Sequence, residues 1–151
     1  MVRVARKNEL DINQTDFAVA LNEWFEDVKK LADISIADQL LITSAGAEVY
    51  KEALEEVTNR KHRTHYNRKV YGHMADSILL AKKNPDGQRD GTCTVGFDQY
   101  HALNAWHLND GTKFIAGDHF ITNTQENTAK TVLLAEKAAY TALIAKRGGS
   151  L

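Results

Sequence analysis

Apolar and polar residues in the first part of the chain follow the spacing of an amphipathic helix. Thr15 offers a hydroxyl at an N-cap position, and Asp16 places a carboxylate in the first turn, where it favours a helix N-terminus. Apolar side chains then recur every three or four residues, at Phe17, Leu21, Trp24, Phe25, Val28 and Leu31. Because burying two such aromatics contributes several kcal/mol, at about 25 cal/mol per Å², this face is expected to find a partner.

A second helix is expected to begin in the break at residues 33–37, where Asp33 and Ser35 are capping residues, and to run to about Asn59. Its predicted inward positions are Leu40, Ala47, Tyr50, Leu54 and Val57, and its outward positions are Glu48, Lys51, Glu52, Glu55 and Glu56. Gly46 weakens the middle of this helix by about 1 kcal/mol relative to alanine. The glycine therefore indicates either a close helix crossing or a kink.

Two β-prone runs follow, and a turn-rich segment joins them. The runs cover residues 77–80 and 92–97, and Asn84-Pro85-Asp86-Gly87 lies between them. This pattern predicts an antiparallel hairpin with a long, exposed loop. Alternation in the second run places Cys93 on the same face as two apolar residues, so the cysteine is expected to point into the core and to be unreactive.

The stretch from Trp106 to Phe120 joins the hairpin to the last helix and combines aromatics, two histidines and several helix breaks. A short helix is expected over Tyr100–Leu108, stopped by Asn109-Asp110-Gly111. A short strand is then expected at Lys113–Ile115. The join between sheet and final helix is thus the region where distinctive features are expected.

A long last helix is expected to be capped by Asp118 and to run to Arg147. Its apolar positions are Ile121, Ala129, Val132, Leu133, Tyr140, Leu143 and Ile144. Residues 122–128 are polar, so the first two turns are expected to fray or to stand clear of the core.

These elements predict an α+β fold, in which a small antiparallel sheet packs against two N-terminal helices and one long C-terminal helix. With no repeat or linker, residues 1–151 are expected to form a single domain. Residues 1–14 alternate basic and apolar side chains and are interpreted as a flexible arm that orders on a partner, with Arg3, Arg6 and Lys7 as its contact residues.

Composition narrows the class of protein. A formal charge of -1 gives no global attraction to nucleic acid or to an anionic membrane. The single cysteine cannot form an intrachain disulfide, and the chain opens with no secretory leader, which suits a reducing cytoplasm. No apolar run approaches the roughly 18 to 20 residues of a membrane span. A soluble protein without membrane contact is expected.

The segment Arg60–Lys69 is strongly basic and lacks apolar periodicity, so it is expected to be an exposed loop. One interpretation is a solvated surface. The other is a mobile loop that contacts phosphate or an acidic partner, because forked arginine donors suit such contacts. The candidate contact residues are Arg60, Lys61, Arg63, Arg68 and Lys69.

Six histidines raise the possibility of a metal site. The candidate ligands are His62 with His65, or His101, His107 and His119 with Asp110 and Asp118. The spacing argues against a site, since there is no HExxH motif or cysteine pair, and residues six apart lie on different sides of a helix.

Nucleophilic catalysis is also weakly supported. Ser77 with His73 and Asp76 is one candidate set, and Cys93 with a histidine is another, but neither lies in a known nucleophile motif. The glycines at 87, 91 and 96 do not form a phosphate-binding loop. We expect no catalytic residue, no cofactor and no metal.

Several short motifs together resemble the neck or tail-completion proteins of tailed phages, the family related to minor tail protein Z. The resemblance covers about three quarters of the length. Its motifs are held here by His73, Asp76, Ser77 and Ile78, by Val95–Phe97, by Trp106, Gly111 and Thr112, and by the final GDHF at residues 117–120. Where many members have a Pro-rich exit before the last helix, this chain has Ala116-Gly117-Asp118-His119, which puts the geometry of that join in doubt.

The resemblance implies a non-enzymatic component of the head-to-tail connection of a long-tailed bacteriophage. Its expected partners are copies of itself in a ring such as a hexamer, other neck and tail proteins, and the genomic DNA in the channel. The expected location is the virion, at the neck or tail top, after assembly in the host cytoplasm. Two alternatives stay open: a small histidine-rich metal-binding protein or enzyme, and a nucleic-acid-binding module with Tyr66 and Tyr71 as stacking residues.

Overall fold

The computed structural model describes residues 17–26, 34–64 and 70–146. The chain divides into two units, one formed by residues 35–149 and the other containing the N-terminal part. Residues 17–26 of the N-terminal unit are helical, which agrees with the first predicted helix, and its cap at Thr15 lies outside the described residues. The arm at residues 1–14, with Arg3, Arg6 and Lys7, also lies outside them.

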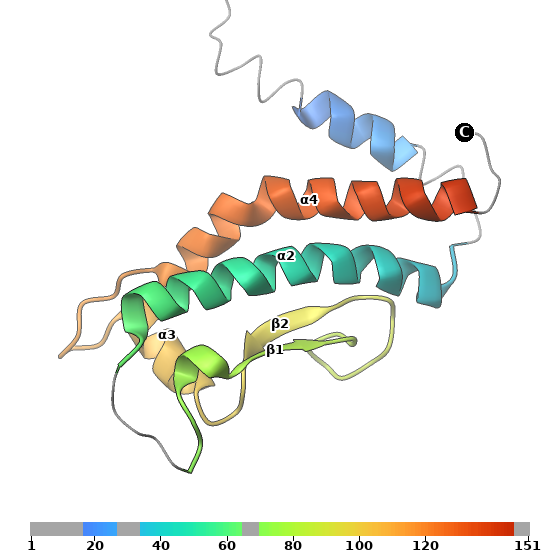
Figure 1. Cartoon of the computed structure of the whole chain (residues 1–151). Coiled ribbons are helices and arrows are strands. Elements are labelled where there is room, and N and C mark those ends of the chain that lie inside the picture. Colours follow the sequence, from blue (N-terminus) through green and yellow to red (C-terminus); the bar gives the residue numbers. More distant parts are fainter. Residues whose placement is uncertain (1–16, 27–33, 65–69, 147–151) are drawn as a thin grey trace, which may run out of the picture. The chain divides into compact units, whose positions relative to one another are not determined.

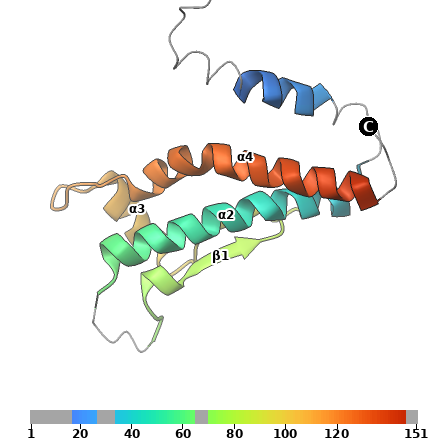
Figure 2. The ribbon, with the colours of Figure 1, turned by 45° about the horizontal axis from the view of Figure 1, so that its top comes forward.

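Two helices of equal length form the frame of the larger unit. Helix α2 spans Ile36–His62 and helix α4 spans Phe120–Lys146. They lie side by side and run in opposite directions (Figures 1 and 2). Ser35 caps α2 as predicted, since its hydroxyl accepts a hydrogen bond from the Asp38 N–H at 3.1 Å.

The predicted close crossing at Gly46 is confirmed. A Cβ atom at this position would lie 2.7 Å from Glu136 Cγ and 2.9 Å from Val132 Cγ1, both on α4. A side chain at position 46 would have to displace the side chains of Glu136 and Val132. The glycine thus lowers the intrinsic stability of α2 but permits its packing on α4.

A two-stranded antiparallel sheet packs against α2, as predicted. Strand β1 spans Ile78–Ala81 and strand β2 spans Thr94–Phe97, with Ile78 opposite Phe97. A one-turn 3-10 helix, η1, spans Met74–Asp76 and precedes β1. A long loop, residues 82–93, joins the strands. Helix α3 spans Ala102–Asp110 and follows β2 (Figure 1).

The main core lies where α2, the sheet, α3 and the start of α4 meet. Phe120 and Ala105 are completely buried, and Phe120 makes edge contacts with the rings of Phe97 and His62. The buried members of this cluster are Leu54, Met74, Ile78, Ala105, Phe120 and Ile121. Tyr50 and Val57, two predicted inward positions of α2, pack against it. The α+β fold class is therefore confirmed for the described residues.

Three sequence expectations about element boundaries are wrong. Helix α2 continues to His62, so the basic segment begins on a helix rather than in a loop. Residues 113–115 form no strand; a single β-bridge between Gly111 and Ala116 closes a tight loop around them. The start of α4 is not frayed, because Thr124 is buried and donates its hydroxyl hydrogen to Phe120 O at 2.6 Å. Satisfying the hydroxyl within the helix lets a polar residue enter the core.

Across the described segments, the helices are all too short or too polar to cross a membrane.

Candidate functional site

The predicted basic contact residues divide into two groups. Arg60 and Lys61 lie in the last turn of α2 and Arg63 is its C-cap residue, where positive charge is favourable. Arg68 and Lys69 lie outside the described residues. Basic residues in this segment therefore help to end a helix. Of the three cations with described positions, Lys61 and Arg63 lie near carboxylates, and Arg60 makes no hydrogen bond or ion pair with the described residues.

Arg63 is engaged within the chain. Its guanidinium donates two hydrogen bonds to the Asp76 carboxylate in a bidentate arrangement, at 2.5 Å and 3.3 Å. Its Nε donates a hydrogen bond to Asn59 Oδ1 at 2.6 Å. The hydrogen bond from Arg63 is the main cause that holds the pKa of Asp76 below its ordinary value. These contacts tie the end of α2 to η1, which limits the capacity of Arg63 to contact DNA.

Asp118 joins the end of α2 to the segment that leads into α4. Its Oδ2 lies 2.9 Å from His62 Nε2 and 3.9 Å from Lys61 Nζ. Its Oδ1 accepts a hydrogen bond from the Phe120 N–H at 3.1 Å, so the predicted role at the helix start is confirmed. The His62 contact is at ion-pair distance, but its ring N–H is not aligned on the carboxylate. Asp118 is thus a structural link between two helix ends.

Asn109 is the main structural residue that the sequence reasoning missed. It is completely buried at the end of α3, and its Oδ1 accepts hydrogen bonds from the Ile121 N–H at 2.9 Å and the Thr122 N–H at 3.2 Å. Its Nδ2 donates to Asp110 Oδ1 at 2.9 Å. An amide from one helix therefore caps the first turn of another, where backbone N–H groups lack intrahelical partners.

The loop between α3 and α4 presents two apolar side chains to solvent. Phe114 is 84% exposed and Ile115 is 46% exposed. We call Phe114 and Ile115 the apolar tip. The loop projects from the end of the helix pair in Figures 1 and 2. The Lys113 ammonium lies 4.9 Å from the centre of the Phe114 ring, within cation–π distance.

The apolar tip is held in a fixed backbone conformation. The Thr112 N–H donates to Ile115 O at 2.8 Å, and Thr112 Oγ1 accepts from the Phe114 and Ile115 N–H groups, both at 3.2 Å. At the base of the loop, a Cβ at Gly111 would lie 2.6 Å from Gly117 N, and a Cβ at Gly117 would lie 2.5 Å from Asp110 C. Two glycines thus let the ends of the loop approach closely, and Gly111 also takes a positive φ of 84°.

A groove of about 680 Å³ lies between α2, α4 and the loop of residues 82–93. Its apolar lining includes Ala47, Val95 and Val132, and its polar lining includes Tyr50, Cys93, Thr128, Asp90 and Glu136. Among the described residues, the lining contains two carboxylates and no lysine or arginine. Volume and lining are in the range of sites that bind small molecules or inserted side chains.

Two ionisable groups of the groove are perturbed by burial. Burial raises the pKa of the Glu136 carboxyl, and it also raises the pKa of Tyr50, whose hydrogen bond with Gln125 acts in the opposite direction. Within the described residues, Glu136 has no hydrogen bond or ion pair. The sequence did carry a signal for its position, because it lies four residues after Val132 and so shares its helix face.

Cys93 lies just before β2 and faces α2, so the prediction that it points into the core from the second strand is wrong. Its Sγ lies 3.5 Å from the hydroxyls of both Thr43 and Ser44. The Thr43 hydroxyl also donates to Gly91 O at 2.8 Å, which fixes the loop against the helix. Cys93 is only partly buried and lines the groove.

The candidate nucleophile set is not assembled. The Ser77 hydroxyl is buried and donates to Met74 O at 2.7 Å, while Asp76 is exposed and faces Arg63. His73 Nδ1 accepts from the Ala75 N–H at 3.0 Å, and its Nε2 lies 3.1 Å from the Thr64 hydroxyl. Each of the three side chains therefore faces a different structural partner.

Two of the histidines proposed as metal ligands each lie next to one aspartate. His62 faces Asp118, and His101 Nδ1 lies 2.7 Å from Asp98 Oδ1. Of the residues with described positions, no three His, Cys, Asp or Glu side chains form a group that could hold a metal ion. His65 lies outside the described residues.

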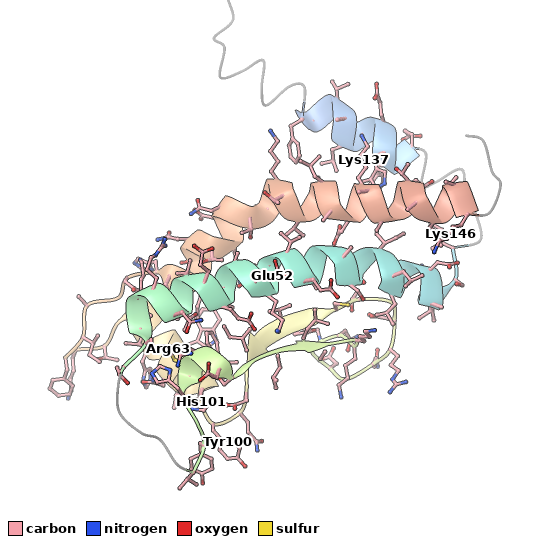
Figure 3. All side chains as sticks on the ribbon, viewed as in Figure 1. Glu52, Arg63, Tyr100, His101, Lys137 and Lys146 are labelled. Carbon is pink, nitrogen blue, oxygen red and sulfur yellow. The ribbon has the colours of Figure 1, made fainter. Side chains whose placement is uncertain are left out.

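A second exposed aromatic feature lies near the end of α2. Tyr71 and Tyr100 stack with ring centres 4.3 Å apart and an angle of 24°, and more than half of each side chain is exposed. His101 lies beside Tyr100 (Figure 3), and its Nε2 is 3.2 Å from Gly72 O, which ties the two tyrosine-bearing segments together. The predicted partner of Tyr71, Tyr66, lies outside the described residues.

Comparison with known proteins found no matching family model, curated protein or solved structure. The resemblance to phage neck proteins therefore stays a prediction.

Proposed function

We propose that this chain is a non-enzymatic structural subunit of the head-to-tail connection of a long-tailed bacteriophage, which assembles into a ring around the DNA channel. The proposal takes its biological setting from the sequence motifs. Its main structural support is the apolar tip, Phe114 and Ile115, which the loop holds in solvent.

Exposing a phenylalanine on a constrained loop is unfavourable unless another surface covers it. Scattered exposed apolar residues are normal, but Phe114 is 84% exposed on a loop fixed by backbone and Thr112 hydrogen bonds. Such preorganisation lowers the entropy lost on binding. Aromatic anchors of this type commonly carry a large share of the binding energy in protein interfaces. The tip supports a role in docking to protein.

Subunits of a closed ring contact each other through two different surfaces. The tip lies at the His62 end of α2, whereas the groove begins near Thr43 on the same helix. Two distinct surfaces at separate positions on one chain suit the heterologous contacts of a ring. Because helices α2 and α4 pack together between the tip and the groove, the distance between these two surfaces is the same in every copy.

The test is genetic complementation in the phage that encodes this chain. Phage deleted for the gene is supplied with wild-type protein, with Phe114→Ala, or with the control Leu79→Ala, which removes a 57% exposed apolar side chain from β1. We expect wild type and Leu79→Ala to restore joined particles, and Phe114→Ala to leave separate heads and tails. If the deleted phage forms joined particles without any supplied protein, or if purified virions do not contain the protein, the proposal is rejected.

A nucleic-acid-binding module is the second candidate, and the Tyr71–Tyr100 stack favours it. The outer faces of two stacked, exposed rings can receive bases of a single strand. This function predicts oligonucleotide binding that weakens steeply with salt and is reduced at least about fivefold by Tyr100→Ala. Phe114→Ala is the matched control, because it removes an exposed aromatic ring elsewhere. Binding that is equal in both variants would reject this candidate.

A further inference from the structure

The groove between α2, α4 and the β1–β2 loop contains a carboxylate without a hydrogen-bond or ion-pair partner in the described part of the chain. Glu136 is partly buried on α4, and among the described residues no cation or hydrogen-bond donor engages it. Withdrawing a carboxylate from water without such a partner is unfavourable. Asp90 adds a second carboxylate, and no basic residue with a described position lines the groove. The groove therefore favours an apolar ligand that carries a positive charge.

The same chain presents a ligand of this chemistry. Lys113 and Phe114 are adjacent in the exposed α3–α4 loop, with the ammonium above the aromatic ring. Ile115 extends the apolar surface. A phenylalanine side chain buries about 150 to 250 Å² when it is covered, and the groove volume of about 680 Å³ has room for both apolar side chains of the tip.

The tip of one molecule cannot enter its own groove. Asp118 fixes the base of the loop at His62, while the groove is lined by α2 residues such as Gly46 and Ala47. The groove lining reaches Gln125 near the start of α4, but Glu136 lies sixteen positions after Phe120, which is about 24 Å at 1.5 Å per residue. The loop projects beyond the ends of α2 and α4, away from the middle of the helix pair (Figure 1). The loop spans only residues 111–119 and is closed by the bridge between Gly111 and Ala116. A second copy of the chain must supply the tip.

We propose that the apolar tip of one copy inserts into the groove of the next copy, with Lys113 paired to Glu136. Because tip and groove are different surfaces, the contact is heterologous and continues from copy to copy until a ring closes or a filament grows. The contact itself depends only on the two surfaces. Closure into a ring in the virion rests on the function proposed above.

A charge exchange tests the pairing. Lys113→Glu and Glu136→Lys are each expected to place like charges together and to weaken self-association at least about tenfold. Mixing the two variants restores both contacts, because each tip then meets a groove of opposite charge. The double variant K113E/E136K should also associate. Association is measured by sedimentation velocity and native mass spectrometry, and recovery in the mixture shows that both variants are folded.

Cysteine cross-linking tests the location. Cys93 lines the groove, so Ile115→Cys places a thiol at the tip that can be joined to Cys93 of the next copy by a short bis-maleimide. We expect a ladder of covalent oligomers and a cross-linked peptide that joins positions 93 and 115. The matched variant I115C/C93S should lose the ladder. Phe114→Ala should weaken self-association at least about tenfold, as for an aromatic anchor.

The outcomes separate this inference from the proposed function. Multimers that persist unchanged in Phe114→Ala and in both charge variants would overturn the tip-and-groove contact and leave the ring subunit standing. A restored charge pair and a 93–115 cross-link, in a protein that phage particles do not contain, would support the contact and reject the neck function. Wild-type protein that stays monomeric at millimolar concentration would overturn the contact.

Discussion

Replacing Asn109 with alanine is expected to destabilise the larger unit by about 2 to 4 kcal/mol. Loss of a capping side chain costs about 1 kcal/mol. The substitution also leaves the Ile121 N–H, which lies in the buried first turn of α4, without its acceptor at 2.9 Å, and an unpaired buried donor costs about 1 to 3 kcal/mol. For a chain of this size, each kcal/mol lost from the free energy of unfolding lowers Tm by roughly 2 to 4 °C. A decrease in Tm of about 5 to 15 °C is therefore expected.

Urea denaturation followed by far-UV circular dichroism measures this change. The matched control is Asn104→Ala, which removes the same side chain from an exposed position of α3, where its amide donates a weak hydrogen bond to Met74 Sδ at 3.5 Å. The control is expected to change stability by less than about 0.5 kcal/mol. If Asn109→Ala unfolds at the same urea concentration as the control, with the same slope, the capping role assigned to Asn109 is wrong.

Three further perturbations follow from the contacts and the pKa directions. Arg63→Ala should raise the pKa of Asp76 toward 3.8, which NMR titration would measure. Because folding lowers this pKa, the Arg63–Asp76 pair stabilises the fold at pH values above 3.8, and its contribution is lost as pH falls through the lowered pKa. An unchanged titration curve would contradict this. Glu136→Gln should stabilise the monomer at pH 7 by up to about 1 kcal/mol after allowance for solvent screening. Because folding raises the pKa of Glu136, its ionised form destabilises the fold, so the gain measured in thermal melts should shrink as pH falls toward 4.5. A gain that grows at low pH would refute the assignment. Phe114→Ala should leave monomer stability within about 0.5 kcal/mol, since its ring is exposed; a large loss in denaturation would mean that the ring is packed in the fold.

The sequence predicted elements whose signals are local. Ser35 caps α2, Gly46 allows the helix crossing, and the segment with Pro85 forms the loop of the hairpin. Each of these depends on a residue type whose conformational preference is strong by itself. Helical spacing also identified Leu54, which is buried, and Tyr50 and Val57, which pack against the core, but it omitted the buried Ile42.

Errors occurred where a tertiary contact overrides the local signal. Phe114 and Ile115 have high strand propensity, but they lie in a loop that Gly111 and Gly117 close through backbone contact. Thr124 is polar yet buried, since its hydroxyl is satisfied by its own helix. The Asn109 cap and the Glu136 groove depend on which helices meet, which one-dimensional periodicity does not specify.

The absence of a side chain at Gly46 also affects the groove. The Glu136 and Val132 side chains lie over Gly46 in the lining of the groove, so the place of the Glu136 carboxylate depends on a residue that offers no functional group of its own. An alanine or serine side chain at position 46 would displace the Glu136 and Val132 side chains. A substitution at this position would therefore move the groove carboxylate itself.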